Sequence, residues 1–236
     1  MPHFGLLGGR MVAVLLAVTV VSACGSGPPP PPSITLTFVR HAQSEANAAG
    51  LVDTLVPGPG LTPLGQDQAQ RAAETLRGKD FDGVYASTMV RTQQSAAPLA
   101  RDLGEQVQVL PGLKEIEAGR FEGIPVADAM STYFLAPTQW LAGDLRATIP
   151  GSISGTEFND QFTGAVQKIY DSGEKNPVAF AHAGSIMVWT MLNVQNPKDS
   201  LMDTHPLPNM GRVVIKGNPV TGWRLVDWDG IENFSS

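Results

Sequence analysis

The sequence is short of cysteine and of positive charge, and each shortage excludes a class of protein. It contains one cysteine in 236 residues, so no disulfide can form within the chain. Its 16 Lys and Arg side chains face 22 Asp and Glu side chains, which gives a formal net charge of -6 at pH 7. This balance argues against a nucleic-acid partner. An anionic ligand must therefore be bound by a few arginines that act against the overall charge.

Histidine is also scarce, with four in the chain. No histidines or cysteines have the spacing of metal ligands, such as His-x-x-x-His or paired cysteines, so we predict no metal site. The length and the hydrophobic fraction of 42% are those of one ordinary globular domain.

The first residues have the pattern of an export signal. Residues 1–10 end in a single positive charge, residues 11–21 are almost wholly apolar, and the sequence Val-Ser-Ala-Cys occupies 21–24. The apolar run is too short to span a bilayer comfortably. Val-Ser-Ala-Cys resembles the lipobox of bacterial lipoproteins, which implies a signal peptide over 1–23 and a lipidated Cys24 on the extracytoplasmic face of the cell membrane. An ordinary secretory signal with an incidental Cys24 is the alternative.

A proline-rich spacer separates this segment from the folded part. Residues 24–32 hold the cysteine, a Gly-Ser-Gly triplet and five consecutive prolines. Such a run adopts the stiff polyproline II form, at about 3.1 Å per residue and so roughly 15 Å in all. We expect the folded domain to cover 33–236, with the spacer holding it away from the lipid surface.

Beyond the spacer, apolar β-branched runs alternate with segments of helical spacing, which favours an α/β fold. The expected strands are Ile34–Val39, Asp82–Ser87, Val107–Leu110, Val178–His182, Arg212–Lys216 and Trp223–Val226. The expected helices are one that Thr62 caps and Gly78 ends, then Arg91–Leu103, Glu157–Tyr170 and Ala183–Leu192. This order predicts a parallel sheet with helical crossovers.

The stretch Pro125–Pro150 is sparse in charge, and we interpret it as a small irregular helical cap. It carries Tyr133, Phe134 and Trp140. A lid over the sheet edge is one interpretation of these aromatic side chains. Packing against the main core is the interpretation that we favour.

Two of the apolar strands end at a histidine. Arg40 and His41 follow the first strand, and His182 ends the strand that begins at Val178. The carboxyl ends of parallel strands meet at one edge of a sheet, where ligands bind in open α/β folds, so we expect both histidines to face one crevice. One such histidine is more often a core residue, whereas two at equivalent strand ends indicate a functional site.

The residues after the first strand carry a family resemblance. The segment Arg40-His41-Ala42-Gln43-Ser44-Glu45-Ala46-Asn47 resembles the Arg-His-Gly-x-Ser/Thr-x-x-Asn signature of the histidine phosphatase superfamily, also called phosphoglycerate mutase-like. Further matches follow in the family's order, namely Leu61-Thr62 with Gly65 and Gln68-Ala69, Ser87 with Arg91-Thr92-Gln93, Leu113-x-Glu115 with Gly119 and Glu122-Gly123, and His182. The resemblance spans 34–226 and implies a three-layer α/β/α sandwich around a mostly parallel sheet.

Four of these residues suit the binding of phosphate. A phosphomonoester carries two negative charges, so cations and donors must neutralise its oxygens before a nucleophile can reach phosphorus. Arg40 and Arg91 fit this task, because a guanidinium binds phosphate through two parallel hydrogen bonds. Asn47 adds a donor. His182 would donate more strongly when protonated, and we expect the charge of a bound phosphate to raise its pKa.

The resemblance implies that His41 is the nucleophile and forms a phosphohistidine, and that Glu115 is the general acid and base. We expect one ring nitrogen of His41 to donate to a fixed acceptor such as a backbone carbonyl, which leaves the other nitrogen free to attack. Glu117 is the runner-up for the acid, although we interpret both Glu117 and Glu122 as solvated loop charges. The implied mechanism uses no cofactor and no metal.

Two positions depart from the family's pattern, because Ala42 and Ala183 replace the usual glycines after the two histidines. If either position needs a positive φ or a close approach of backbone to phosphate, the added methyl lowers rate or binding. We expect activity to survive. The alternative is a catalytically weak lipoprotein that binds a phosphate ligand.

The mutases of the superfamily carry extra basic residues just after the catalytic glutamate, whereas Ile116, Glu117 and Ala118 follow Glu115 here. The segment from Glu115 to His182 also looks shorter than theirs. We therefore expect a phosphatase, a phosphoric monoester hydrolase that acts on a small phosphomonoester with an apolar or aromatic part. A phosphoglycerate mutase-like phosphotransferase is the alternative.

Overall fold

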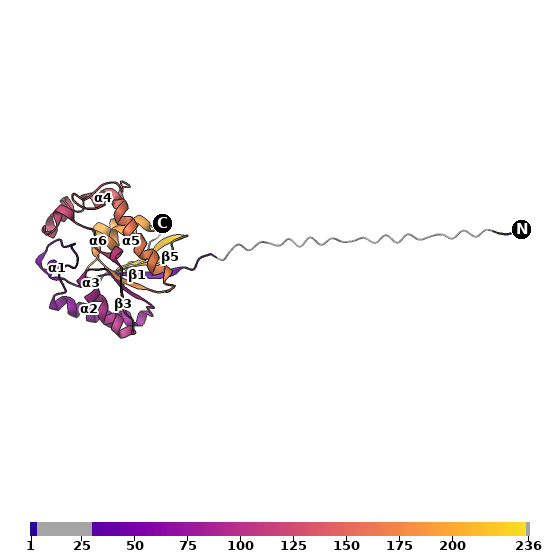
Figure 1. Ribbon diagram of the computed structural model, residues 1–236, viewed down its shortest axis with the longest axis horizontal. Helices are drawn as coiled ribbons and strands as arrows, with labels where there is room; N and C mark the ends of the chain where they lie inside the picture. Colours follow the sequence, from indigo (N-terminus) through magenta and orange to yellow (C-terminus); the bar gives the residue numbers. More distant parts are fainter. Residues whose placement is uncertain (4–29, 235–236) are drawn as a thin grey trace. The chain divides into compact units, whose positions relative to one another are not determined.

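A six-stranded sheet in the order β3-β2-β4-β1-β5-β6 runs through the middle of the protein (Figure 1). The computed structural model describes residues 1–3 and 30–234, and the part from Pro31 onward forms one compact unit. The strands are β1 (Ile34–Arg40), β2 (Val84–Ala86), β3 (Val107–Val109), β4 (Val178–Ala181), β5 (Arg212–Asn218) and β6 (Gly222–Trp228). Strands β3, β2, β4 and β1 pair in parallel, and β5 pairs antiparallel with β1 and β6. The predicted mostly parallel sheet is therefore confirmed.

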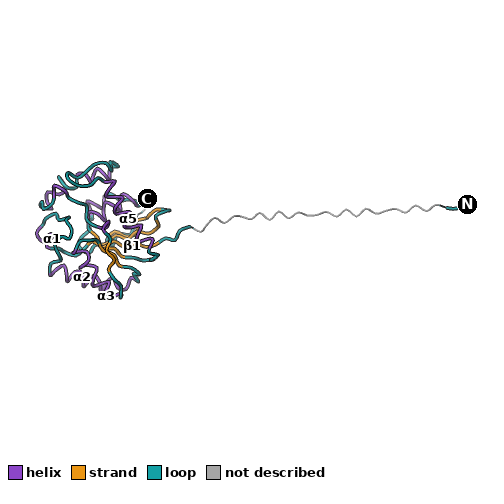
Figure 2. Tube along the Cα trace, in the orientation of Figure 1, coloured by secondary structure: helices purple, strands orange, loops and turns teal. Residues whose placement is uncertain are grey.

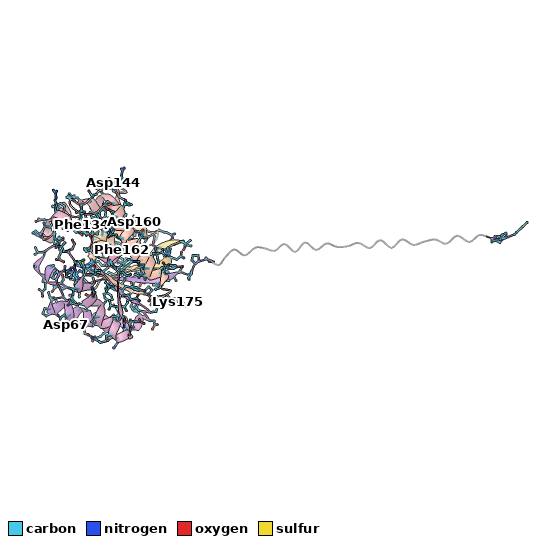
Figure 3. All side chains as sticks on the ribbon, viewed as in Figure 1. Asp67, Phe134, Asp144, Asp160, Phe162 and Lys175 are labelled. Atoms are coloured by element: carbon cyan, nitrogen blue, oxygen red, sulfur yellow. The ribbon has the colours of Figure 1, made fainter. Side chains whose placement is uncertain are left out.

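Helices cover both faces of this sheet, as Figure 2 shows. They are α1 (Glu45–Ala49), α2 (Pro63–Leu76), α3 (Val90–Leu103), α4 (Leu135–Leu141), α5 (Gly155–Asp171), α6 (Ala183–Asn193) and α7 (Ser200–Thr204). Side chains alternate between the faces of a strand, so adjacent residues of β1 enter different layers of the core. Phe38 packs with Phe162 of α5, which is labelled in Figure 3, and with Trp189 of α6. Val39 belongs to a different cluster, together with Leu99 of α3. The three-layer sandwich is confirmed.

The start of α2 follows the predicted chemistry, but its end does not. The hydroxyl of Thr62 accepts a hydrogen bond from the Gly65 amide at 2.9 Å, and Pro63 occupies the first turn. The helix ends at Leu76 rather than at Gly78, because a 3₁₀ turn over Arg77–Lys79 takes over. Gly65 is needed for another reason, since a Cβ there would lie 2.0 Å from the carbonyl oxygen of Gln43.

The cap contains a 3₁₀ segment over Val126–Ser131 and the short helix α4. Trp140 is fully buried, stacks on Phe158 of α5 and donates its indole N–H to the Ala147 carbonyl oxygen at 2.8 Å. Tyr133 is buried and donates its hydroxyl to the Ile116 carbonyl oxygen at 2.5 Å. Packing of the cap aromatics against the core therefore holds for both residues, although Tyr133 and Phe134 also line a cavity at the sheet edge, as the lid interpretation expects.

The predicted signal peptide and Cys24 lie outside the described residues, apart from residues 1–3. The last three prolines of the predicted spacer lie within them, and the last two of these contact the domain. Asn218 donates to the Pro31 carbonyl oxygen at 3.2 Å, and the Tyr170 hydroxyl donates to that of Pro32 at 3.0 Å. No helix within the described ranges has the length and apolar character needed to cross a membrane.

Candidate active site

A cavity of about 590 Å³ opens beyond the carboxyl ends of β1 and β4. Five of the predicted site residues line it, namely Arg40, His41, Asn47, Arg91 and Glu115. His182 is fully buried next to His41, with 5.1 Å between the ring centroids. The structure thus brings all six predicted residues of the site to one sheet edge, which is the place that the two histidine-ended strands indicated.

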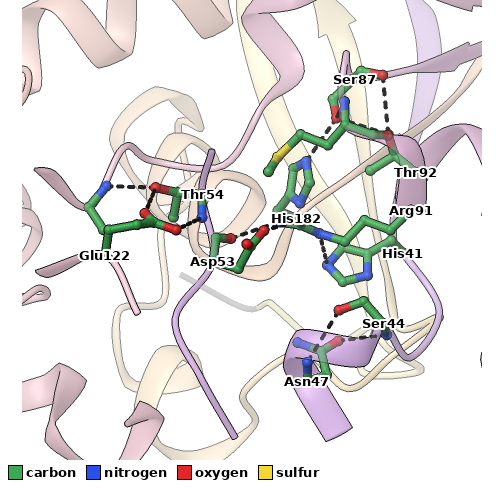
Figure 4. Close-up of polar contacts among 12 residues, drawn as sticks. His41, Ser44, Asn47, Asp53, Thr54, Ser87, Arg91, Thr92, Glu122 and His182 are labelled. Carbon is green, nitrogen blue, oxygen red and sulfur yellow. Dashed lines mark hydrogen bonds and ion pairs between the residues drawn. The ribbon is translucent and has the colours of Figure 1, made fainter. Parts of the chain in front are cut away.

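The ring of His41 is fixed in one tautomer by its neighbours (Figure 4). Its Nδ1 lies 2.7 Å from the Ala42 carbonyl oxygen, which can only accept, so Nδ1 carries the proton. Its Nε2 then holds a lone pair and accepts from Nε of Arg91 at 3.1 Å. Burial, followed by the charge of Arg91, holds the pKa of His41 well below its usual value. The imidazole is therefore neutral, with its basic nitrogen beside a guanidinium.

His182 lies behind this ring and is also held neutral. Burial, followed by the charge of Arg91, lowers its pKa well below the usual value. Its Nε2 lies 2.9 Å from the Ser87 hydroxyl, while its buried Nδ1 has no hydrogen-bond partner. Nε of Arg40 is buried and unpartnered as well. Unpaired buried nitrogens are costly unless a ligand or a water molecule accepts from them.

Arg91 is 3% exposed, so its charge needs a partner inside the protein. Asp53 supplies one, accepting from Nη1 through its carboxylate and from Nη2 through its backbone carbonyl, both at 2.8 Å. All three donor nitrogens of Arg91 are therefore bonded when His41 is included. The sequence-based prediction did not include Asp53, because nothing in its spacing connects it to Arg91.

Glu115 reaches the site from the loop after β3 and lies at the N-terminus of α6. Its carboxylate accepts from the backbone amides of Ile116 at 3.0 Å, Gly184 at 3.2 Å and Ser185 at 2.7 Å. Burial raises the pKa of this carboxyl, and the three hydrogen bonds oppose the increase. A Cβ at Gly184 would lie 2.9 Å from Oε1 of Glu115, so a larger residue at 184 would displace this carboxylate from its present position.

The two alanines that depart from the family's pattern show no backbone strain. Positive φ among non-glycine residues of the described part occurs elsewhere, so neither Ala42 nor Ala183 needs the freedom of glycine. Ala42 is fully buried, packs with Leu61 and Ala69, and donates its amide to the Ser95 hydroxyl at 2.9 Å. Its methyl therefore points into the core and does not line the cavity, whereas Ala183 does line it.

The interpretation of Glu122 as a solvated loop charge is wrong. One of its carboxylate oxygens accepts from the Thr54 amide at 2.8 Å and the other from the Thr54 hydroxyl at 2.6 Å (Figure 4). The same hydroxyl accepts from the Ala118 amide at 2.9 Å. Glu122 thus fixes the residue next to Asp53. Glu117, by contrast, is partly exposed and forms an ion pair with Lys114.

Metal ligands do not gather in this part of the structure. Within residues 1–3 and 30–234, no three His, Cys, Asp or Glu side chains are grouped so that they could hold a metal ion. The metal-free mechanism stays a prediction.

The comparison with known families agrees with this geometry. A family model described as the histidine phosphatase superfamily (branch 1) matches residues 36–229. The chain belongs to this superfamily. Its relatives in the superfamily are named as phosphatases and phosphoglycerate mutases, so the chain belongs to a superfamily of phosphatases and mutases.

Individual relatives place the chain more closely. It is 50% identical over 215 residues to PE-PGRS family protein PE_PGRS11 of Mycobacterium tuberculosis, covering 84% of this chain but only 37% of that protein. It is 29% identical over 151 residues to putative phosphoserine phosphatase 2 of Hydrogenobacter thermophilus, covering 64% of this chain and 74% of that one. A solved mycobacterial glucosyl-3-phosphoglycerate phosphatase, in complex with VO3, superposes with a TM-score of 0.70 at 21% identity, covering 84% of this chain and all of that one. The last similarity shows the fold.

The Glu122 contacts predict a difference between two glutamates of one loop. Glu122→Gln should lower the free energy of unfolding by about 1–2 kcal/mol, because an amide cannot accept both Thr54 hydrogen bonds with charged oxygens. Glu117→Gln, which removes a partly exposed ion pair, should change it by less than about 0.5 kcal/mol. Urea unfolding followed by circular dichroism measures both. Equal losses in the two variants would contradict the bracing role of Glu122.

Proposed function

We propose that this protein is a phosphatase that hydrolyses phosphomonoesters through a phosphohistidine on His41. The observation that carries the proposal is the state of that ring, because its Nδ1–H donates to the Ala42 carbonyl and leaves Nε2 unprotonated, with its electron pair accepting only from Arg91. A neutral imidazole in this tautomer is a nucleophile at Nε2. The nitrogen lies at a cavity beside two arginines, where a phosphate group would be bound.

Arg40, Arg91 and Asn47 would bind the phosphate oxygens. A dianion beside the guanidinium of Arg91 would compete for the donor that now reaches His41, freeing Nε2 for attack. The same anion would raise the pKa of His182, whose unpartnered Nδ1 is then a strong donor. The negative charge of the substrate thus creates the protonation state that stabilises the transition state.

In the first step Nε2 of His41 forms a bond to phosphorus while the ester P–O bond breaks. The leaving oxygen takes its proton from Glu115, whose raised pKa keeps a fraction of the carboxyl protonated above its usual range. In the second step the Glu115 carboxylate takes a proton from water. The resulting hydroxide attacks phosphorus, the N–P bond breaks and inorganic phosphate leaves with His41 neutral again.

The direct test is phosphate release by the full chain, purified in nonionic detergent, against a panel of phosphomonoesters. Wild type should turn over at least one ester, and His41→Ala should lower kcat by 10³-fold or more, on the order of the loss seen when a nucleophile is removed. Activity in the presence of a chelator tests the absence of a metal from the mechanism. Turnover that survives in His41→Ala would refute the proposal, whereas transfer to an acceptor alcohol instead of water would indicate a phosphotransferase.

The pKa shifts predict the pH profile. Because the pKa of His41 lies below its usual value of about 6.5, Nε2 stays unprotonated in mild acid. The value of kcat/KM should therefore not decrease until the pH is well below 6.5. Because the pKa of Glu115 is raised, the acid stays protonated above its usual range and activity should fall only as pH rises further. Rates between pH 4 and 9 measure both limbs. An acid limb centred at pH 6.5 in wild type, or a basic limb unchanged in Glu115→Gln, would contradict this assignment.

We also propose that the protein is anchored to the extracytoplasmic face of a bacterial membrane through a lipid on Cys24. The support is the sequence alone, a lipobox-like Val-Ser-Ala-Cys after an apolar run. Expressed in a bacterial host and labelled with radioactive palmitate, wild type and Ser26→Ala should incorporate label and enter the detergent phase of Triton X-114. Cys24→Ala should do neither. Unlabelled wild-type protein would count against anchoring.

A further inference from the structure

The cavity is much larger than a phosphate group and changes character away from His41. Beyond the phosphate end its lining is mostly apolar, with side chains from the cap, α6 and α7. Examples are Met130, Tyr133, Phe134, Leu141, Met187 and Met202. A volume of about 590 Å³ is typical of a site that holds a whole small molecule. Most of the cavity would therefore hold the alcohol part of the substrate, which leaves when the ester bond breaks.

The cationic side chains that line the cavity are all at one end of it. Among the described residues that line it, the only Lys or Arg side chains are Arg40 and Arg91, both next to His41. Arg91 is already paired with Asp53. The lining elsewhere includes the carboxylates Asp199 and Asp203, at α7. A second acidic group on a substrate would meet no free cation there and would be repelled by these aspartates.

The mouth of the cavity is apolar as well. Val126 and Met130 both line it, yet they are 52% and 61% exposed, so they present apolar surface to solvent when the cavity is empty. The Tyr133 hydroxyl has no proton left to donate to a ligand, because it donates to the Ile116 carbonyl oxygen. What the cap presents to a substrate is therefore mainly hydrocarbon and aromatic ring surface.

We infer that the site selects phosphomonoesters of apolar alcohols, alkyl or aryl, that carry no second acidic group. This inference rests on the proposed function and specifies its substrate class. The phosphate binds at Arg40 and Arg91 while the apolar part displaces water from the cap side of the cavity. Burial of hydrocarbon then supplies the binding free energy, and Asp199 and Asp203 exclude esters such as phosphoglycerate.

A series of primary alkyl phosphates tests the apolar half of the inference. From ethyl to octyl phosphate, kcat/KM should rise by about two- to fourfold for each methylene that is buried. At equal concentration, 3-phosphoglycerate should react at least tenfold more slowly than butyl phosphate. A flat series, or a preference for 3-phosphoglycerate, would overturn the inference while leaving the phosphatase proposal intact.

Two matched pairs of variants locate the effect. Met130→Gln should reduce the increase in kcat/KM from ethyl to octyl phosphate several-fold. Leu135→Gln should leave this increase unchanged, since Leu135 is a similarly exposed cap residue that does not line the cavity. Asp203→Lys should raise kcat/KM for 3-phosphoglycerate at least fivefold. Asp160→Lys makes the same charge change on α5 at a residue that does not line the cavity, and should leave kcat/KM for 3-phosphoglycerate unchanged. Equal effects within either pair would place selectivity outside the cavity.

The two proposals fail in different ways. If no ester in the panel is hydrolysed, the proposed function fails, and calorimetric binding then judges the substrate class alone. Octyl phosphate should bind more tightly than ethyl phosphate, and more tightly than 3-phosphoglycerate. The opposite order in binding would overturn the inference even in an inactive protein.

Discussion

The site depends on a guanidinium buried at the carboxyl edge of a sheet. Arg91 is 3% exposed, and an unpaired charge at that depth would cost several kcal/mol. Three of the five N–H donors of Arg91 bond to Asp53 and to the lone pair of His41. The carboxylate of Asp53 is the one formal negative charge among these partners. That compensation neutralises Arg91 without neutralising Arg40 beside it. Arg40 therefore remains available to a bound anion, and burial, followed by the charge of Arg91, holds the pKa of both histidines well below the usual value.

A second constraint comes from the N-terminus of α6. The first turn of a helix offers unpaired amides and a partial positive charge, and Glu115 accepts from two of them across almost seventy residues of sequence. These bonds stabilise the carboxylate, while burial favours the protonated acid. A carboxyl poised between the two forms suits a group that must give a proton in one step and take one in the next. The helix thus positions the acid and moderates its basicity at once.

The parts that could be predicted from the sequence are those encoded locally. Apolar runs predicted the strands, and Thr62 and Pro63 predicted the start of α2. The ordered motif that contains His41, Arg91 and Glu115 indicated the family. Asp53 and Glu122 were missed or misread because their roles arise from partners 38 and 68 residues away. Neither Ala42 nor Ala183 has the positive φ that would need glycine, while the effect of the Ala183 methyl on a bound phosphate stays a prediction. The glycine in close contact with the site is Gly184, because the fold brings the Glu115 carboxylate next to it.

The cap connects selectivity to catalysis through the loop that carries the acid. Tyr133 lines the cavity with its ring and bonds the Ile116 carbonyl with its hydroxyl, one residue from Glu115. Trp140 secures the same cap by stacking on Phe158 of the core. An apolar group that packs against the cap would therefore contact a side chain that is hydrogen-bonded to the residue next to the proposed general acid. Binding free energy from a part of the substrate that does not react can in this way order the groups that do, which is how remote contacts raise kcat as well as lower KM.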